Sequence, residues 1–306
     1  MLRLSAAPCA PPPGHLTEGP VWDDRREELL WVDITERLIH RATLGLRGDG
    51  SGLPDLVPYE TMRLDRPVGA VVPCASGALL AAAGTSFLRL DGHRTPVEIT
   101  VPDIPGDGVR RRMNDAKCDP RGRLLAGTMA YDETPGAGAL YRLGPGGLET
   151  LLGSVTISNG LGWSPDGRLL YYADSPTGRV DVFDHDPGTG ALTGRRPFVT
   201  LDRGVPDGLT VDAGGRIWVA VWGGAEVRAY EPDGTLSARV AVPASHVTSC
   251  TFAGPELDIL VITTASQGLD EDGLRAEPDA GRLFVCRPGV RGLPVTPFDD
   301  AEFLAM

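Results

Sequence analysis

The sequence lacks the cysteine pattern and the long apolar runs that mark many secreted and membrane proteins. Its five cysteines are an odd number, lie far apart and form no Cys-x-x-Cys pair, so we expect neither a disulfide framework nor a thiolate zinc site. Pro8 and the triple proline at 11–13 precede any apolar segment long enough for a signal peptide or a membrane span. These absences predict a protein of a reducing, cytoplasmic compartment.

Positive charge is also scarce. The chain has 29 Lys and Arg residues against 41 Asp and Glu, a net charge of -12, so its average surface repels phosphate backbones and anionic membranes. We therefore expect neither nucleic acid nor a membrane as a partner. Lysine is nearly absent, since every basic residue except Lys117 is an arginine. Lys117 is either a solvated strand residue or a lysine with a particular role.

Several catalytic motifs are missing from the chain. It contains no Gly-x-Ser-x-Gly elbow, no P-loop, no Gly-x-Gly-x-x-Gly after a strand and no His-Glu-x-x-His, so covalent serine catalysis and nucleotide binding lack support. Its histidines form no His-x-His or His-x-x-x-His pair, and we expect them to be surface or structural residues. His246 is the one that could face a pocket.

What the chain does have is a succession of short apolar runs separated by turn residues. Forty glycines and 27 prolines are spread along its 306 residues, and 42% of the residues are apolar, enough for a sizeable core. The runs have strand length, and no long amphipathic helix interrupts them. We predict an all-β protein, with a flexible N-terminal arm over residues 1–14 and a single domain over residues 15–306.

The turns and strands repeat along the chain. Three superposable segments start 45 and 48 residues apart, and they are Asp119–Leu125, Ser164–Leu170 and Asp212–Trp218. Three further copies bring the number of units to six, and they are Asp23–Leu30, Cys74–Leu80 and Gly254–Leu260. A period of about 40 to 50 residues with several strands in each unit is typical of a β-propeller. The sequence therefore predicts six blades.

One position in each unit lies five residues ahead of the turn, where the innermost strand of a blade begins near the central channel. These positions form a predicted ring, which reads Glu18, Gly69, Asn114, Asn159, Asp207 and Ser249. Singly, Asn159-Gly160 and Asp207-Gly208 are also ordinary turn formers, and a structural protein could fill the channel with such side chains. In register, however, two carboxylates around a narrow axis would repel each other unless a cation lay among them.

The oxygen ligands of this ring suit a hard divalent ion such as Ca²⁺, Mg²⁺ or Mn²⁺, with waters completing the coordination shell. They do not exclude zinc. The sequence therefore predicts a metal site in the central channel.

Several stretches of the chain, in this order, resemble the senescence-marker-protein, gluconolactonase and luciferin-regenerating-enzyme family. The resemblance runs from about Leu16 to Phe298, and its main stretches are Glu18–Trp22, Arg112–Pro120, Ala126–Met129, Ser158–Leu161, Pro206–Gly208, Thr248–Cys250 and Pro278–Gly281. It implies a six-bladed propeller with one divalent ion, which would be Ca, Zn, Mn, Mg or Fe. The implied ligands are Glu18, Asn159 and Asp207.

The resemblance also implies a substrate and the residues that bind it. Members of the family typically hydrolyse aldonolactones, and residues matching Arg112 and Asn114 bind the sugar. A further carboxylate follows the Gly-Thr-Met segment, near Asp132 and Glu133, and we assign it to Asp132, an aspartate in place of a glutamate. Asp207 is our candidate general base.

Two other functions stay open. One is a metal-dependent esterase or phosphotriesterase acting on a non-sugar substrate. The other is a non-enzymatic, calcium-binding propeller.

Overall fold

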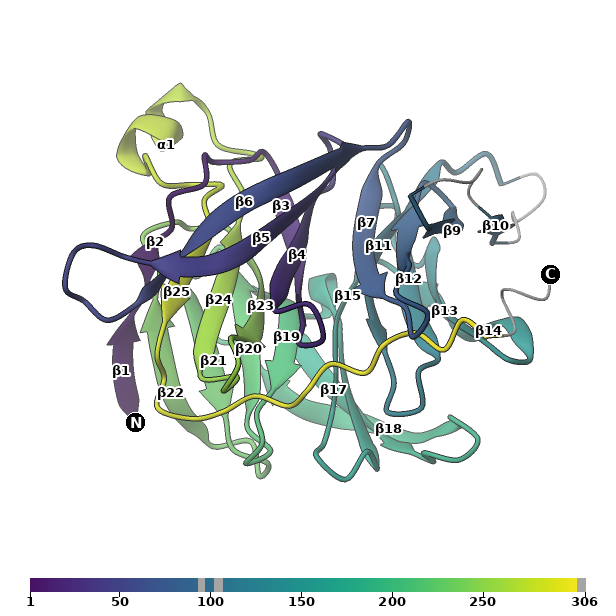
Figure 1. Ribbon diagram of the computed structural model, residues 1–306. Coiled ribbons are helices and arrows are strands. Elements are labelled where there is room, and N and C mark those ends of the chain that lie inside the picture. The colour runs from purple at the N-terminus through teal and green to yellow at the C-terminus, as the bar shows by residue number, and fades with distance from the viewer. Residues whose placement is uncertain (93–96, 102–106, 302–306) are drawn as a thin grey trace.

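The computed structural model describes residues 1–92, 97–101 and 107–301, and within them the strands form six sheets (Figure 1). The first three sheets are each built from consecutive antiparallel strands. Blade 1 contains β3 (Thr17–Asp23), β4 (Glu28–Asp33), β5 (Leu38–Leu46) and β6 (Pro54–Arg63). Blade 2 contains β7 (Val68–Pro73), β8 (Leu79–Ala83), β9 (Ser86–Leu90) and β10 (Val97–Thr100). Blade 3 contains β11 (Arg111–Cys118), β12 (Leu124–Ala130), β13 (Gly138–Gly144) and β14 (Gly147–Val155).

The other three sheets continue the pattern, and the last two also include strands from the N-terminus. Blade 4 contains β15 (Ser158–Trp163), β16 (Leu169–Asp174), β17 (Arg179–His185) and β18 (Leu192–Thr200). Blade 5 contains β19 (Val205–Val211), β20 (Ile217–Trp222), β21 (Glu226–Tyr230), β22 (Leu236–Ala241) and β1 (Leu2–Ser5). Blade 6 contains β23 (Val247–Ala253), β24 (Ile259–Thr264), β25 (Phe284–Cys286) and β2 (Ala7–Pro8). The predicted all-β, six-bladed propeller is confirmed.

The first strands of the six blades form a closed ring. Each inner strand contacts the inner strand of the blade before it and of the blade after it, and β23 of blade 6 contacts β3 of blade 1. In the described residues, six hydrophobic clusters each join the facing sheets of two neighbouring blades. The inner strands are therefore apolar on both faces, because each lies between two other blades.

The first residues of the chain differ from the loose arm that we expected. Strand β1 pairs in parallel with β22, and β2 pairs with β25. Strand β2 thus supplies the outer strand of a blade whose other strands come from the opposite end of the chain. The expectation was wrong because a proline-rich composition reports local stiffness, whereas these residues are held by sheet edges formed far away in the sequence.

A C-terminal strap, residues 291–300, crosses one end of the channel (Figure 1). It starts beside blade 5, where the Ala213 amide donates to Arg291 O at 2.8 Å. It ends at blades 2 and 3, where the Phe298 amide donates to Pro73 O at 2.8 Å and the Asp299 amide to Gly122 O at 2.9 Å. The strap therefore covers the end of the channel toward which the inner strands run.

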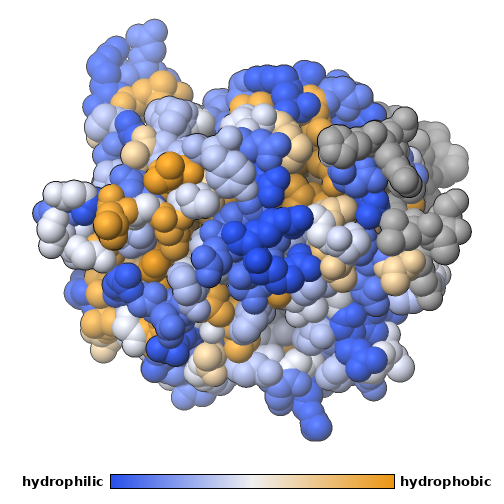
Figure 2. Space-filling view, viewed as in Figure 1, coloured by the Kyte–Doolittle hydropathy of each residue, from blue (hydrophilic) through white to orange (hydrophobic). Residues whose placement is uncertain are grey.

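Helical structure is sparse. A 3₁₀ turn, η1 (Ser175–Thr177), follows β16, and a short helix, α1 (Glu271–Ala276), begins at Asp270, whose carboxylate accepts the Gly273 amide. Among the described residues, no helix is both long enough and apolar enough to cross a membrane. On the face shown in Figure 2, hydrophilic residues interrupt the hydrophobic ones. That face therefore offers no broad apolar surface.

Candidate active site

Each inner strand departs from regular antiparallel pairing at its ring position. In β3, Glu18 pairs with Val32 and Val21 with Leu30, so β3 has one residue more than β4 between the two pairs. The five other inner strands have the same irregularity, between residues 68 and 70, 113 and 116, 158 and 161, 206 and 209, and 247 and 249. A bulge turns a side chain away from the direction that regular alternation would give it. Six equivalent bulges therefore redirect the chain at all six ring positions.

Glycines let the inner strands approach one another closely at this level. A Cβ on Gly69 would lie 2.3 Å from the backbone oxygen of Asn114, and a Cβ on Gly160 would lie 2.6 Å from the backbone oxygen of Asp207. No side chain fits at such distances. The ring position in blade 2 is thus a glycine because the backbone of blade 3 occupies the space.

A cavity of about 310 Å³ opens at this level of the channel. Its polar lining residues are Glu18, Arg112, Asn114, Glu133, Asn159, Ser175, Asp207 and Gln267. Its other lining residues are Leu16, Ile34, Met129, Ile157, Pro176, Val205 and Trp222. Five of the six residues that we singled out thus line one cavity, although they come from four different blades.

Asp132, the sixth, does not line this cavity. Its carboxylate is exposed and accepts hydrogen bonds from the amide of Thr134, at 3.2 Å, and from the Thr134 hydroxyl, at 2.7 Å. The next residue, Glu133, has a positive φ of 56° and lines the cavity instead. The cavity is thus lined by the residue after the one that we assigned, because a turn with a left-handed residue does not follow the alternation of the strand before it.

Two carboxylates, of Glu18 and Asp207, are buried together at the centre of the site. Burial raises the pKa of both carboxyl groups well above their usual values, and repulsion from neighbouring carboxylates adds to the shift. Both groups are therefore harder to ionise than ordinary carboxyl groups.

Glu18 also has an orphaned oxygen. Its Oε2 accepts the amide of Gly19, but its buried Oε1 has no hydrogen-bond partner among the described residues. A buried carboxylate oxygen without a donor is costly, whereas a cation would satisfy it. This oxygen is therefore chemically suited to contact a cation.

A directed chain of hydrogen bonds orients the amide side chains. Arg112 Nη1 donates to Asn114 Oδ1 at 2.6 Å, and Asn114 Nδ2 donates to Asn159 Oδ1 at 2.7 Å. Asn159 Nδ2 then donates to Ser175 Oγ at 2.7 Å, and the Ser175 hydroxyl donates to Pro206 O at 2.7 Å. Because its nitrogen is engaged with Ser175, Asn159 presents its oxygen, which has a second lone pair, to the cavity.

Sequence reasoning missed Ser175. It lies in η1, outside the repeated inner-strand register, and nothing in its local sequence distinguishes it from an ordinary turn residue. Only the position of η1 against β19 places its hydroxyl between Asn159 and Pro206.

The donor set fits a hard divalent ion. Within the described part of the chain, no group of three or more His, Cys, Asp or Glu side chains is placed to hold a metal ion. The site combines two carboxylates with an amide oxygen instead, and such ligands suit Ca²⁺, Mg²⁺ or Mn²⁺ completed by water. Glu18, Asn159 and Asp207 are the residues that would hold the ion.

His246 lies beside the cavity without lining it. Its ring stacks on the Trp222 indole, with centroids 4.1 Å apart and planes inclined by 7°, and its Nδ1 lies 2.9 Å from Gln267 O. Trp222 and Gln267 both line the cavity. His246 therefore supports two residues of the wall.

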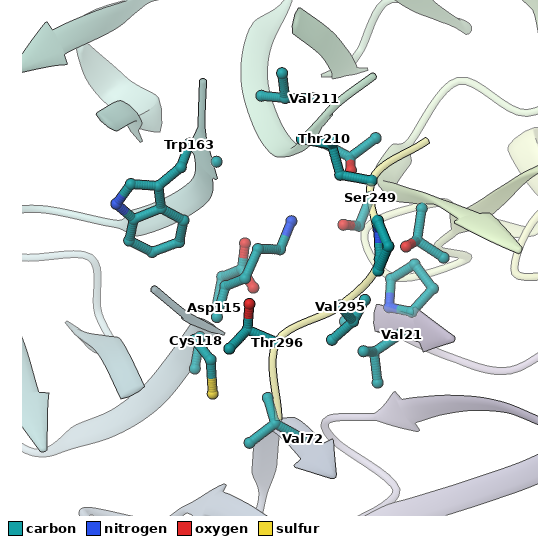
Figure 3. Close-up of a pocket in the computed structure, with 18 of the residues that line it drawn as sticks. Val21, Val72, Asp115, Cys118, Trp163, Thr210, Val211, Ser249, Val295 and Thr296 are labelled. Carbon is teal, nitrogen blue, oxygen red and sulfur yellow. The ribbon is translucent and has the colours of Figure 1, made fainter. Parts of the chain in front are cut away.

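A second cavity, of about 230 Å³, lies along the channel between the ring and the C-terminal strap (Figure 3). Asp115 and Lys117 of β11 and Ser249 of β23 line it, and residues 293–296 of the strap close it. Ring residue Ser249 thus faces this cavity and not the first one. Lys117, for which we left a solvated position open, points into the channel.

Comparison with known proteins gives concordant results. A family model described as "SMP-30/Gluconolactonase/LRE-like region" matches residues 16–266. Regucalcin of Danio rerio is 38% identical over 284 residues, which cover 90% of this chain and 92% of that protein. Two solved structures cover nearly the whole chain. A calcium-binding protein, regucalcin, from Agrobacterium tumefaciens has a TM-score of 0.83 at 29% identity, covering 97% of this chain and 99% of its own. A luciferin-regenerating enzyme has a TM-score of 0.81 at 30% identity, covering 94% and 96%.

Proposed function

The chain belongs to the SMP-30/gluconolactonase/LRE-like family, and from this premise we propose that it is a lactonase that hydrolyses a sugar-derived aldonolactone to the aldonic acid, with one divalent metal ion. Family membership supports a lactonase-type function. The proposal of a sugar substrate is supported by the polar residues that line the cavity. The proposal of a metal ion is supported above all by the buried Oε1 of Glu18, which lacks a hydrogen-bond partner among the described residues.

The ion would be held by Glu18, Asn159 and Asp207. When bound there, a divalent ion supplies a Lewis acid that polarises the carbonyl of a lactone. The protein's own contribution is to hold three oxygen ligands from blades 1, 4 and 5 at fixed positions, and the hydrogen-bonded chain through Asn114 and Ser175 does this for Asn159.

The cavity has polar and apolar lining residues, which suit the hydroxyl groups and the carbon skeleton of a sugar lactone. Arg112, Asn114 and Glu133 offer donors and acceptors for hydroxyl and carbonyl oxygens, and the Arg112 guanidinium carries five N–H donors. Leu16, Trp222 and the other apolar lining residues form the rest of the wall and exclude water. A lactone would bind with its hydroxyl groups toward blade 3.

Asp207 is the proposed general base. Its carboxylate takes a proton from the attacking water, whose oxygen bonds to the carbonyl carbon, and the ester bond to the ring oxygen then breaks. Asp207 returns the proton to that ring oxygen, which leaves as a hydroxyl group. A carboxyl group whose pKa is raised by burial is suited to both steps.

The test is acid release from 1,4- and 1,5-aldonolactones by metal-free protein before and after addition of one equivalent of Ca²⁺, Mg²⁺, Mn²⁺, Zn²⁺ or Fe²⁺. We expect a metal-dependent rate above spontaneous hydrolysis. Asp207→Asn should lower kcat by at least about 100-fold, and Glu18→Gln should weaken metal binding by at least about 100-fold, or ~2.7 kcal/mol. Asp202→Asn is the control, because Asp202 is an exposed carboxylate that pairs with the buried Arg228 of the same blade. The proposal fails if no metal gives a rate above the spontaneous one.

A non-sugar ester is the second candidate, and the apolar side of the cavity favours it. Leu16, Ile34 and Trp222 would accommodate an alkyl or aryl group as readily as the carbon face of a sugar. A phenyl acetate and a phosphotriester, assayed beside the lactones, decide between the candidates. If Ca²⁺ raises the melting temperature and no substrate is turned over, the protein is a calcium-binding propeller instead.

A further inference from the structure

Lys117, the single lysine of the chain, lines the second cavity of the channel. It is partly buried on the inner strand β11, and its Nζ donates to Leu209 O of β19 at 2.7 Å. These residues are 92 positions apart, and blade 4 lies between their two blades. The hydrogen bond therefore connects blade 3 to blade 5 through the inside of the channel.

The hydrogen bond is made next to the bulge of β19, where regular pairing with β20 is interrupted. Pro206 pairs with Val221 and Leu209 with Val219, so Asp207 and Gly208 lie within the bulge, outside the regular register of β19 and β20. Two side chains from other blades bind the carbonyls on either side of the bulge. Ser175 of blade 4 binds Pro206 O, and Lys117 of blade 3 binds Leu209 O. The backbone on each side of Asp207 is thus hydrogen-bonded to a side chain of another blade.

Lys117 also brings a positive charge close to the carboxylates of Asp115 and Glu18. Asp115 precedes it by two residues on β11 and is buried, and its charge acts on both Glu18 and Asp207. Lys117 is the favourable charge partner of Asp115. A compact ammonium with three donors can serve a carbonyl and a carboxylate in a narrow channel, where a planar guanidinium would need more room. This difference gives a physical reason for lysine at this one position in an arginine-rich chain.

We propose that Lys117 is a positioning residue for the metal and substrate site, which it serves by fixing the β19 backbone at Leu209, on the C-terminal side of Asp207, and by balancing the charge of Asp115. The part of this inference that concerns the substrate rests on the proposed function. The effect of Lys117 on metal affinity can be measured whether or not the protein hydrolyses a lactone. Lys117 lines the second cavity and not the first, so it acts through Asp207 and does not touch the substrate.

The test compares Lys117→Met with the wild type by isothermal titration of metal-free protein with Ca²⁺ or Mn²⁺. We expect a cooperatively folded variant whose metal affinity is at least tenfold weaker, and whose kcat at saturating metal is at least tenfold lower while KM changes less. The matched control is Arg142→Met. Arg142 is also a partly buried cation of blade 3, donates to the backbone oxygen of Thr189 in blade 4 at 2.9 Å and pairs with Glu149. This variant should lose thermal stability and keep its metal affinity within twofold.

Lys117→Met could fail to fold because Asp115 loses its charge partner. In that case the double variant Asp115→Asn/Lys117→Met is compared with Asp115→Asn alone. The double variant should still bind metal at least tenfold more weakly than Asp115→Asn. Metal affinity and kcat within twofold of the reference protein would overturn the proposal, as would a wild type that binds no divalent ion. A wild type that hydrolyses no lactone, combined with weaker metal binding by the variant, would refute the lactonase function and leave the role of Lys117 standing.

Discussion

Nδ2 of Asn114 lies 2.7 Å from Oδ1 of Asn159, although the two residues are 45 positions apart and lie in different blades. This contact fixes which end of each amide faces which neighbour. Asn114 must use its nitrogen as donor, and Asn159 must then give its own nitrogen to Ser175. The blade 3 and blade 4 parts of the cavity wall are thus joined by one amide-to-amide hydrogen bond.

Replacing Ser175 with alanine tests this orientation. Ser175→Ala removes the acceptor for Asn159 Nδ2 and the donor to Pro206 O, so the Asn159 amide is free to turn. We expect metal affinity to fall by about tenfold, as is common when a residue behind a metal ligand is lost. The control is Ser164→Ala in the same blade, whose hydroxyl donates only to the surface residue Asp166 at 2.6 Å. Equal metal affinities of both variants would contradict the prediction.

Glu133 and its neighbour Asp132 form a natural pair of variants. Glu133→Gln removes the charge of a residue that lines the cavity, and we expect the KM for a sugar lactone to rise by about tenfold through loss of a charge-assisted hydrogen bond. Asp132→Asn retains an acceptor for Thr134 and lies outside the cavity, so its KM should be unchanged. Steady-state kinetics at saturating metal makes the comparison. A larger rise in KM for Asp132→Asn than for Glu133→Gln would show that Asp132 binds the substrate instead.

The buried carboxylates predict a pH-dependent stability of the metal-free protein. Burial raises the folded-state pKa of Glu18 and Asp207 above ordinary values of 4.5 and 3.8, so above about pH 4 the folded state binds more protons than the unfolded state. Their favourable contribution is therefore complete below that pH and is lost as the pH rises. Between pH 5 and pH 8 in chelator, the wild type should lose at least about 1.4 kcal/mol relative to Glu18→Gln.

Denaturant unfolding of both proteins at the two pH values measures this difference. Saturating metal should remove it in the wild type, because a ligand that binds only the folded state stabilises that state. A difference that does not change with pH would show that the two carboxyl groups do not titrate as their burial requires.

Gly69 tests the close approach of blades 2 and 3. A Cβ there would lie 2.3 Å from Asn114 O and 2.7 Å from the carbonyl carbon of Met113, both backbone atoms that cannot turn away. We expect Gly69→Ala to lower the free energy of unfolding by about 2 kcal/mol and to weaken metal binding, since β11 carries Asn114. Gly153→Ala, whose Cβ would meet no atom within 4 Å, should be neutral or slightly stabilising. Thermal unfolding with and without metal compares the two.

Much of the fold follows from local sequence. Apolar runs such as Leu124–Thr128 and Leu169–Ala173 fall within strands β12 and β16, because short runs bounded by Gly, Pro and Asp have few other ways to be buried. The N-terminal strands were missed for the opposite reason. The sequence of β1 and β2 carries no sign of the β22 and β25 edges that receive them.

The sequence by itself determined the six repeats, the ring register and hence the meeting of Glu18, Asn114, Asn159 and Asp207 in one cavity, because a closed propeller brings equivalent positions of its blades to one axis. The tertiary structure alone decided which atoms those residues present. The bulges arise from pairing within a blade, and Glu133 faces the cavity in place of Asp132 because of a left-handed turn. The hydroxyl of Ser175 on Pro206 O and the Lys117 ammonium on Leu209 O join different blades, where no local pattern records the contact. The repeat of the blades determines which residues meet at the axis. The packing of blades with different sequences determines the orientation of their side chains.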